Sequence, residues 1–213
     1  MAAFPCVEMA MKLYYSPGAC SLADHIVLEW IGAPYEAIAV SREARKAPGF
    51  LAINPAGAVP ALVEDDGWVL TQNSAILHYL GATNPEARLL GDGSARGMAE
   101  VDRWLAFVNA DVHPSFWPYF GGLSWLKDEA LVAQGKAAAG TKLRGLFQRA
   151  DAQLEGRDWI AGDRSIADPY LFVVTRWAKS VGVDLTGLGH LERFFQRMLA
   201  DPGVQRAMAA EGL

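Results

Sequence analysis

Residues 11–29, MKLYYSPGACSLADHIVLE, change from a strand pattern to a helix pattern within one short stretch. Residues 12–16 are short and aromatic, which is typical of a β-strand, and Pro17-Gly18 breaks that strand. From Cys20 or Ser21 to Ile31 the apolar side chains share one helical face, and Gly32 is suited to end the helix. The stretch therefore predicts a strand, a tight turn and a helix.

The residues that follow, as far as position 91, continue this alternation of strands and helices. Residues 41–54 are polar and contain Pro48-Gly49, so we expect an irregular segment with one helical turn. This order of elements predicts a small mixed sheet with helices on its faces, which is a thioredoxin-like α/β domain over residues 11–91. The other expected elements are strands at 35–40, 60–63 and 68–71, a hairpin turn at 65–67 and a helix at 73–82.

Strand patterns disappear after the Pro- and Gly-containing segment 84–94, where we place a domain boundary. Ser165-Ile166-Ala167-Asp168 has the pattern of a capping box, in which the Ser side chain accepts from a first-turn amide and the Asp carboxylate reaches back. The predicted second domain, residues 95–213, is all-α. Its helices are expected at 98–112, 128–154, 170–174, 188–199 and 202–209.

Composition and charge argue against several classes of protein. The chain has 213 residues and a formal net charge of −5, from 19 basic and 24 acidic side chains, which disfavours nucleic acid or an anionic membrane as a partner. No apolar run approaches the ~18 residues of a membrane span. Cys6 and Cys20 form neither a disulfide framework nor a metal-ligand pattern, so we expect a cytoplasmic protein without a metal. Residues 1–10 lack the features of a signal peptide and are interpreted as an N-terminal extension.

Cys20 follows a strand and a Pro-Gly turn and opens a helix, which makes it the first candidate for chemistry. Unpaired amides and the positive end of the helix dipole lower the pKa of a thiol in such a position and make it a nucleophile. The alternative is a small buried apolar residue. Ala23 stands where a C-x-x-C motif has its second thiol, which disfavours two-thiol redox cycling.

Three further positions are candidates for a ligand site. Val59-Pro60 begins a strand opposite the Cys20 loop; a cis bond there would leave the Val59 backbone free to pair with an extended peptide, and a trans bond is the alternative. Gln72-Asn73 offers amides and a helix N-terminus to a ligand carboxylate, or only a helix cap. His113 is either catalytic or structural. The aromatic residues around it either belong to the core or line an apolar cleft: Trp104, Phe107, Phe116, Trp117, Tyr119 and Phe120.

These motifs lie within five stretches: MKLYYSPGACSLADHIVLE (11–29), INPAGAVPALVEDDG (53–67), LTQNSAILHYL (70–80), DRSIADPYLFVVTRWA (163–178) and DPGVQRAMAAEGL (201–213). In their order and spacing they resemble the cytosolic glutathione transferases, most closely the bacterial beta class. The resemblance covers the chain from Met11 onward. It implies a thioredoxin-like domain that binds glutathione as co-substrate, an all-helical second domain, and a homodimer.

The resemblance also implies a glutathione site, formed by Tyr15, Cys20, Val59, Pro60, Gln72, Asn73 and Asp111. Cys20 would lie beside the glutathione sulfur, with which it can form a mixed disulfide. Val59, before a cis-proline, would pair through its backbone with the cysteinyl part, and residues 72–73 would hold the γ-glutamyl end. Asp111 would reach toward the glutathione of the other subunit, and His113 would face the site from the helical domain.

The sequence departs from the family pattern at three positions. Gln72 stands where many beta-class members have Glu, so a charge pairing becomes a neutral hydrogen bond. Asn73 stands where Ser or Gly is common, and Pro114 replaces a Lys that often follows the His. The loop at 41–50 is short compared with relatives, so three residues stay equal candidates for the glycine carboxylate of glutathione: Arg42, Arg45 and Lys46.

Three functions are compatible with these residues. In the first, a glutathione thiolate attacks a small hydrophobic electrophile bound by Phe107, His113, Phe116 and Trp117, with Cys20 and His113 as catalytic residues; this is a detoxification activity. In the second, Cys20 attacks a disulfide, a peroxide-derived species or a halogenated substrate, and glutathione resolves the adduct. In the third, the fold binds ligands or another protein without catalysis. We expect the first.

Overall fold

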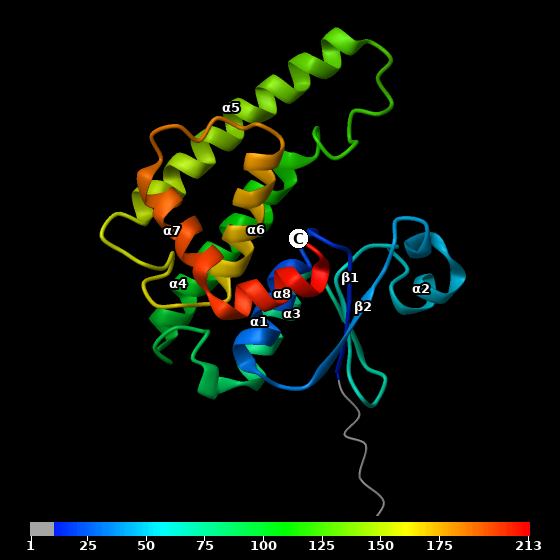
Figure 1. Ribbon diagram of the computed structural model, residues 1–213, viewed down its shortest axis with the longest axis vertical. Helices are drawn as coiled ribbons and strands as arrows, with labels where there is room; N and C mark the ends of the chain where they lie inside the picture. The colour runs from blue at the N-terminus through cyan, green and yellow to red at the C-terminus, as the bar shows by residue number, and fades with distance from the viewer. Residues whose placement is uncertain (1–10) are drawn as a thin grey trace, which may run out of the picture.

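The computed structural model describes residues 11–213, and the expected N-terminal extension with Cys6 lies outside the described residues. The first half is a four-stranded sheet in the order β2-β1-β3-β4 with helices beside it (Figure 1). β1 and β2 are parallel, and β3 is antiparallel to both β1 and β4. This arrangement confirms the thioredoxin-like prediction. The strands are β1 (Met11–Tyr15), β2 (Tyr35–Ala39), β3 (Ala61–Val63) and β4 (Val69–Thr71).

Helix α1 (Leu22–Ile31) connects β1 to β2 and is buried over most of its length. It packs against α3 (Asn73–Thr83) of the same half and against α6 (Ala167–Ser180) and α8 (Pro202–Glu211) of the other. Gly32 ends α1 at a φ of 74°, a left-handed conformation that glycine adopts without steric cost. Helix α1 is therefore the element through which the two halves share one core.

The segment predicted to be irregular, residues 41–54, contains more helix than expected. A 3₁₀ turn covers Ala44–Lys46, and a short helix, α2, covers Pro48–Ile53. Pro48 occupies the first position of α2, where its missing N–H has no helical partner to lose. The Pro-Gly pair that indicated an irregular segment thus begins a helix.

The second half is helical, as predicted, and the expected domain boundary at 84–94 lies between α3 and α4 (Figure 1). The prediction of one regular helix over 98–112 was wrong in part, because α4 gives way at Phe107 to a π-helical segment, Phe107–Val112, followed by a 3₁₀ turn, His113–Phe116. Such changes of winding are frequent at functional sites. The helices not yet given are α4 (Ala95–Ala106), α5 (Glu129–Gln153) and α7 (Gly189–Ala200).

The capping box at the start of α6 is confirmed in its carboxylate half. The Ser165 N–H donates to Asp168 Oδ2 at 2.7 Å, and the Ile160 N–H donates to Asp168 Oδ1 at 2.9 Å. The Ser165 hydroxyl also donates to Asp168 Oδ2 at 3.0 Å, while accepting from the Ala167 N–H at 3.3 Å. Asp168 therefore joins the loop before α6 to its first turn, and the apolar run that follows is buried as predicted.

Within residues 11–213, the structure contains no helix of the length and apolar character needed to cross a bilayer.

Candidate active site

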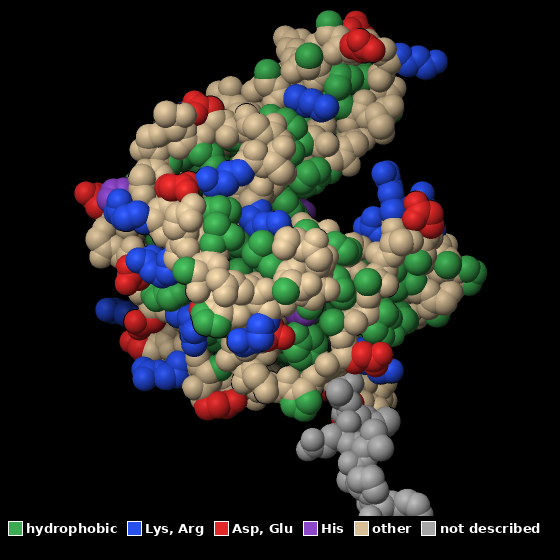
Figure 2. Space-filling model, viewed as in Figure 1, with side chains coloured by type: hydrophobic (Ala, Val, Ile, Leu, Met, Phe, Trp, Pro, Cys, Tyr) green, Lys and Arg blue, Asp and Glu red, His purple; other side chains and the backbone are tan. Residues whose placement is uncertain are grey.

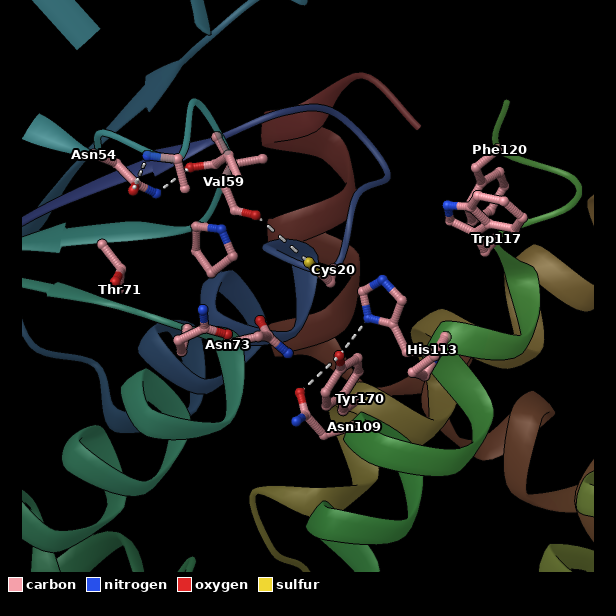
Figure 3. Close-up of a pocket in the computed structure, with 15 residues that line it drawn as sticks. Cys20, Asn54, Val59, Thr71, Asn73, Asn109, His113, Trp117, Phe120 and Tyr170 are labelled. Atoms are coloured by element: carbon pink, nitrogen blue, oxygen red, sulfur yellow. Dashed lines mark hydrogen bonds between the residues drawn. The ribbon is translucent and has the colours of Figure 1, made fainter. Parts of the chain in front are cut away.

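A cavity of about 500 Å³ lies where the two halves meet, and the space-filling view shows a hollow between them with Lys and Arg side chains on the rim near α2 (Figure 2). One wall carries polar and backbone groups of the thioredoxin-like half, and the other carries side chains of the helical half (Figure 3). The first wall consists of Cys20, Asn54, Ala56, Ala58, Val59, Pro60, Thr71, Gln72 and Asn73. The second consists of Asn109, His113, Pro114, Trp117, Phe120 and Tyr170.

Cys20 lies immediately before α1, and its thiol donates to the Val59 carbonyl oxygen over 3.7 Å. Burial raises the pKa of this thiol to about 12, and the nearby Asp24 carboxylate adds to the rise. The backbone N–H groups of Cys20 and Ser21, and the charge of Arg45, oppose the rise but do not cancel it. The backbone groups at the helix start do lower the pKa of Cys20, as expected, but they do not activate the thiol, because desolvation outweighs them.

The loop before Cys20 is held from the helical half. The Trp177 indole N–H donates to the Gly18 carbonyl oxygen at 2.8 Å, and the Gly18 N–H donates to Glu211 Oε2 at 2.8 Å. The other Glu211 oxygen pairs with His25 Nδ1 at 3.0 Å, and both side chains are buried. Side chains from α1, α6 and α8 thus hold the loop that leads to the Cys20 thiol.

The Val59-Pro60 bond is cis, as predicted. Asn54 fixes the loop that leads to it: its side-chain amide donates to the Ala58 carbonyl at 2.6 Å, and its Oδ1 accepts from the Ala56 N–H at 3.1 Å. Within the described chain the Val59 N–H has no hydrogen-bond partner. A donor is therefore left free in the cavity wall next to Cys20, which is the arrangement that suits an extended peptide ligand.

Gln72 and Asn73 lie at the start of α3 but play different parts. Gln72 is exposed to the cavity, with a φ of 76°. Asn73 is buried, and in the amide orientation that satisfies both ends its nitrogen donates to Asp24 Oδ2 at 2.6 Å and to the Cys20 carbonyl at 3.0 Å. The Asn73 amide nitrogen is thus engaged by the protein itself.

His113 begins the 3₁₀ turn after the π-helical segment and faces Cys20 across the cavity (Figure 3). Its Nδ1 lies 2.5 Å from the Tyr170 hydroxyl, which in turn donates to Asn109 Oδ1 at 3.3 Å. The Trp177 ring packs edge-on against the imidazole at 4.8 Å. Burial lowers the pKa of His113, so the ring is neutral at neutral pH.

The aromatic residues divide between cavity and core. Trp117 and Phe120 line the cavity and are 56% and 52% exposed. Phe107 and Phe116 were expected in the same substrate site, but both are buried: Phe107 packs against Trp104, and Phe116 stacks under Phe120. Helical periodicity places aromatic groups on a segment, but the altered winding at Phe107 decides which of them face outward.

Two residues expected at the glutathione site do not line the cavity. Tyr15 is buried in β1, and its hydroxyl donates to the Ala210 carbonyl at 3.4 Å. Asp111 is exposed on the π-helical segment, so its expected reach toward a second subunit stays a prediction. Conversely, the sequence analysis assigned no role to Asn54, Asn109 or Tyr170. Asn54 lies in the INPAGAVP motif, but nothing in the local pattern of Asn109 or Tyr170 distinguishes them from ordinary helix residues.

The structure separates the three basic candidates near α2. Arg42 and Lys46 are exposed, whereas Arg45 is half-buried and its Nε is a buried donor with no partner in the described part of the chain. Arg45 is also close enough to Cys20 for its charge to lower the pKa of that thiol. For metal ions, residues 11–213 contain no group of three or more His, Cys, Asp or Glu side chains suited to ligate one.

Comparisons with known proteins agree with this geometry. The family models for the glutathione S-transferase N-terminal and C-terminal domains match residues 19–83 and 105–202. The glutathione S-transferase GST-4.5 of Xanthomonas campestris pv. campestris is 57% identical over 95% of this chain and 100% of that protein. A glutathione S-transferase structure from Xylella fastidiosa has a TM-score of 0.93 at 54% identity, covering 95% of this chain and 99% of that one. A sphingomonad glutathione S-transferase complexed with glutathione has a TM-score of 0.82 at 37% identity, covering 95% and 99%. The chain therefore belongs to the glutathione S-transferase family of enzymes.

Proposed function

We propose that this enzyme transfers the glutathione thiolate to small hydrophobic electrophiles, as a cytoplasmic beta-class homodimer. The observation that carries the proposal is the two-sided cavity, in which a free backbone donor and polar side chains face an exposed aromatic surface. The polar wall suits a peptide with charged ends, and the aromatic wall suits an apolar partner. Holding both reactants in one cavity turns their encounter into a local reaction.

Glutathione would bind along the polar wall. Its cysteinyl part pairs with the backbone of Val59, whose N–H is free beside the cis bond. Its γ-glutamyl end reaches Gln72 and the start of α3, where a helix N-terminus favours a carboxylate. Arg45 is the best-supported partner for the glycine carboxylate, since its buried Nε lacks an acceptor and bidentate pairing with a carboxylate satisfies such a group.

His113 would accept the proton of the glutathione thiol. Both hydrogen bonds of this network form when Nδ1–H donates to the Tyr170 oxygen and the Tyr170 hydroxyl donates to Asn109 Oδ1. That tautomer leaves Nε2 as an unprotonated acceptor on a ring that lines the cavity together with Cys20 (Figure 3). Because burial lowers the pKa of His113, the base is neutral and available at neutral pH.

Cys20 would act as a hydrogen-bond donor to the glutathione sulfur, and not as the nucleophile. Its thiol keeps its proton far above neutral pH, and this single proton, which the Val59 carbonyl accepts in this structure, would turn to the glutathione sulfur instead. A protonated thiol beside a developing thiolate stabilises the negative charge. The alternative in which Cys20 itself attacks a disulfide, peroxide-derived or halogenated substrate is less well supported, since the attacking species is the thiolate.

Calorimetric titration with glutathione tests the binding half of the proposal. We expect one glutathione per chain in the micromolar-to-millimolar range for the wild type, and sedimentation velocity at the same concentration should show a dimer. Arg45→Ala should weaken binding about tenfold, because a charged hydrogen bond contributes ~1.5 kcal/mol or more. Lys46→Ala is the matched control, an exposed neighbour whose loss should change little. Absence of binding in the wild type would refute the proposal.

Conjugation kinetics with a chlorinated aromatic electrophile test the catalytic half. His113→Gln should lower kcat at pH 7 about 10²-fold with little change in glutathione affinity, because only proton removal is lost. His190→Gln, at a half-buried site on α7 that does not line the cavity, is the control and should behave as wild type. Cys20→Ala should retain most of the conjugation rate. Complete loss in Cys20→Ala with an unchanged rate in His113→Gln would favour Cys20 as the nucleophile.

A further inference from the structure

Asp24 is a fully buried carboxyl group directly behind the active-site thiol. It lies one helical turn after Cys20, in the first turn of α1, with no exposed surface. Its Oδ2 accepts from the Asn73 amide at 2.6 Å, and the same amide donates to the Cys20 carbonyl at 3.0 Å. Its Oδ1 has no hydrogen-bond partner within residues 11–213. The Asn73 amide thus connects the Asp24 carboxyl group, one of whose oxygens has no partner within residues 11–213, to the backbone of Cys20.

No positive charge balances Asp24 in the part of the chain that the structure describes. No Lys, Arg or His side chain forms an ion pair with it. The titratable groups that face it are Cys20 on its own helix, Tyr170 from α6 and Glu211 from α8, and the last of these is paired with His25. All three become anions when they lose a proton, so each disfavours ionisation of Asp24. Asn73, from α3, is neutral.

The Asp24 carboxyl group and the Cys20 thiol are both buried and lie close together, so they cannot readily both ionise. Burial already penalises a negative charge on either group, and a charge on one raises the pKa of the other. Groups coupled in this way lose their protons in two steps that belong to the pair. A carboxylic acid is intrinsically several units more acidic than a thiol, so the first negative charge goes to Asp24.

We propose that Asp24 and Cys20 share at most one negative charge near neutral pH, and that Asp24 is a positioning residue that keeps the Cys20 thiol protonated. Asp24 does not line the cavity, so it would act through Cys20. The inference rests on the proposed function, because it explains why the glutathione sulfur, and not Cys20, carries the charge in the transfer reaction. The thiol then remains a hydrogen-bond donor at the edge of the cavity.

The test is the pH dependence of Cys20 alkylation by iodoacetamide, in the absence of glutathione. Peptide mass spectrometry follows Cys20 separately from Cys6. Asp24→Asn keeps the shape of the side chain and removes its charge, so the apparent pKa of Cys20 should fall by about one unit and alkylation at pH 8 should accelerate about tenfold. Asp24→Ser is a second neutral variant, and the same direction is expected.

Asp168→Asn is the matched control, since Asp168 is equally buried but contacts Ser165 and Ile160 instead of the Cys20 loop. Its alkylation profile should superimpose on that of the wild type. Identical profiles for wild type and both Asp24 variants would overturn the inference, as would an equal shift in Asp168→Asn. Since no glutathione is present, a failure to bind glutathione in the calorimetric titration would count against the proposed function without altering this result.

Discussion

Two nearly identical tetrapeptides open α1 and α6, and the structure uses them in opposite ways. Ser21-Leu22-Ala23-Asp24 precedes and enters α1, and Ser165-Ile166-Ala167-Asp168 does the same for α6. Each places a Ser at the start of a helix and an Asp three residues later, and both Asp side chains are fully buried. By local rules each should form a capping box.

Only the second tetrapeptide brings its Asp back to its Ser. Asp168 accepts from the Ser165 and Ile160 N–H groups and from the Ser165 hydroxyl, so both of its oxygens are occupied. In the first tetrapeptide, the Ser21 hydroxyl bonds to the preceding loop instead of to Asp24. It accepts from the Ser16 N–H at 3.3 Å and donates to the Ser16 carbonyl at 3.4 Å. Asp24 is left with the Asn73 amide and a free oxygen.

The difference separates stability from function. Burial raises the pKa of both carboxyl groups, that of Asp168 to about 7, and the hydrogen bonds of Asp168 oppose the rise. A buried carboxylate that is fully hydrogen-bonded holds a fold together, whereas one that is partly bonded costs stability. The fully hydrogen-bonded Asp168 lies where α6 begins, away from the cavity, and the partly bonded Asp24 lies behind the active-site thiol. The same sequence pattern therefore stabilises one helix and adjusts the chemistry beside the other.

Removing the carboxylate of Asp168 should have the largest effect. Asp168→Ala leaves the buried Ile160 and Ser165 N–H groups without acceptors, so the free energy of unfolding should fall by about 4 kcal/mol. Urea denaturation followed by circular dichroism measures it. Asp163→Ala, at an exposed position of the same loop, is the control. A loss below ~1 kcal/mol would show that these hydrogen bonds matter little.

Asp24→Asn should change the pH dependence of stability. The environment raises the pKa of Asp24 above its unfolded value, so its contribution is fully present below the unfolded pKa and is lost as pH rises. That loss runs at about 1.4 kcal/mol per pH unit until folded Asp24 ionises, so the variant should gain stability relative to the wild type as the pH rises from 5. Denaturation at pH 5 and at pH 7 tests this, and a constant difference would contradict the raised pKa.

Ser165→Ala should cost about 1 kcal/mol of unfolding free energy, the usual value of a lost helix cap. The hydroxyl accepts from the Ala167 N–H and donates to Asp168, but Asp168 keeps its two backbone donors in the variant. Thermal and urea unfolding should agree on this value. A loss as large as that of Asp168→Ala would mean that the hydroxyl, and not the carboxylate, holds the box together.

Ser21→Ala should have the smallest effect, about 0.5 kcal/mol, because its two hydrogen bonds are long and both go to one residue. Comparison with Ser165→Ala, by the same urea titration, isolates the difference between the two tetrapeptides. If Ser21→Ala cost as much as Ser165→Ala, the two helix starts would be energetically equivalent despite their different geometry. Cys20 alkylation in Ser21→Ala should stay at the wild-type rate.

Much of the fold could be predicted from short-range patterns. The strand, turn and helix of residues 11–32 and the helical second half follow from alternation, helical periodicity and turn residues, whereas the cis bond before Pro60 was implied only by the family resemblance. The winding change at Phe107 did not follow, because the apolar spacing through it resembles that of an ordinary helix. As a result, the prediction placed Phe107 and Phe116 in the substrate site, while both lie in the core.

Some of the residues that line the cavity were predicted from the sequence, but the electrostatics of the cavity were not. Cys20, Val59, Gln72, His113 and Trp117 do meet in one cavity. No local pattern indicated that Tyr170 and Asn109 would orient His113, since those residues lie on a different helix or an earlier turn and meet it only through folding.

What the sequence by itself determined is the set of local structures: which segments become strands or helices, where they end, and which chemical groups stand at their ends. These depend on backbone conformation and on neighbours a few residues away. Only the tertiary structure decided the raised pKa of Cys20, the hydrogen-bond partner of His113 and the different surroundings of Asp24 and Asp168. The physical reason is that pKa values and hydrogen-bond partners depend on burial and on charges brought close through space.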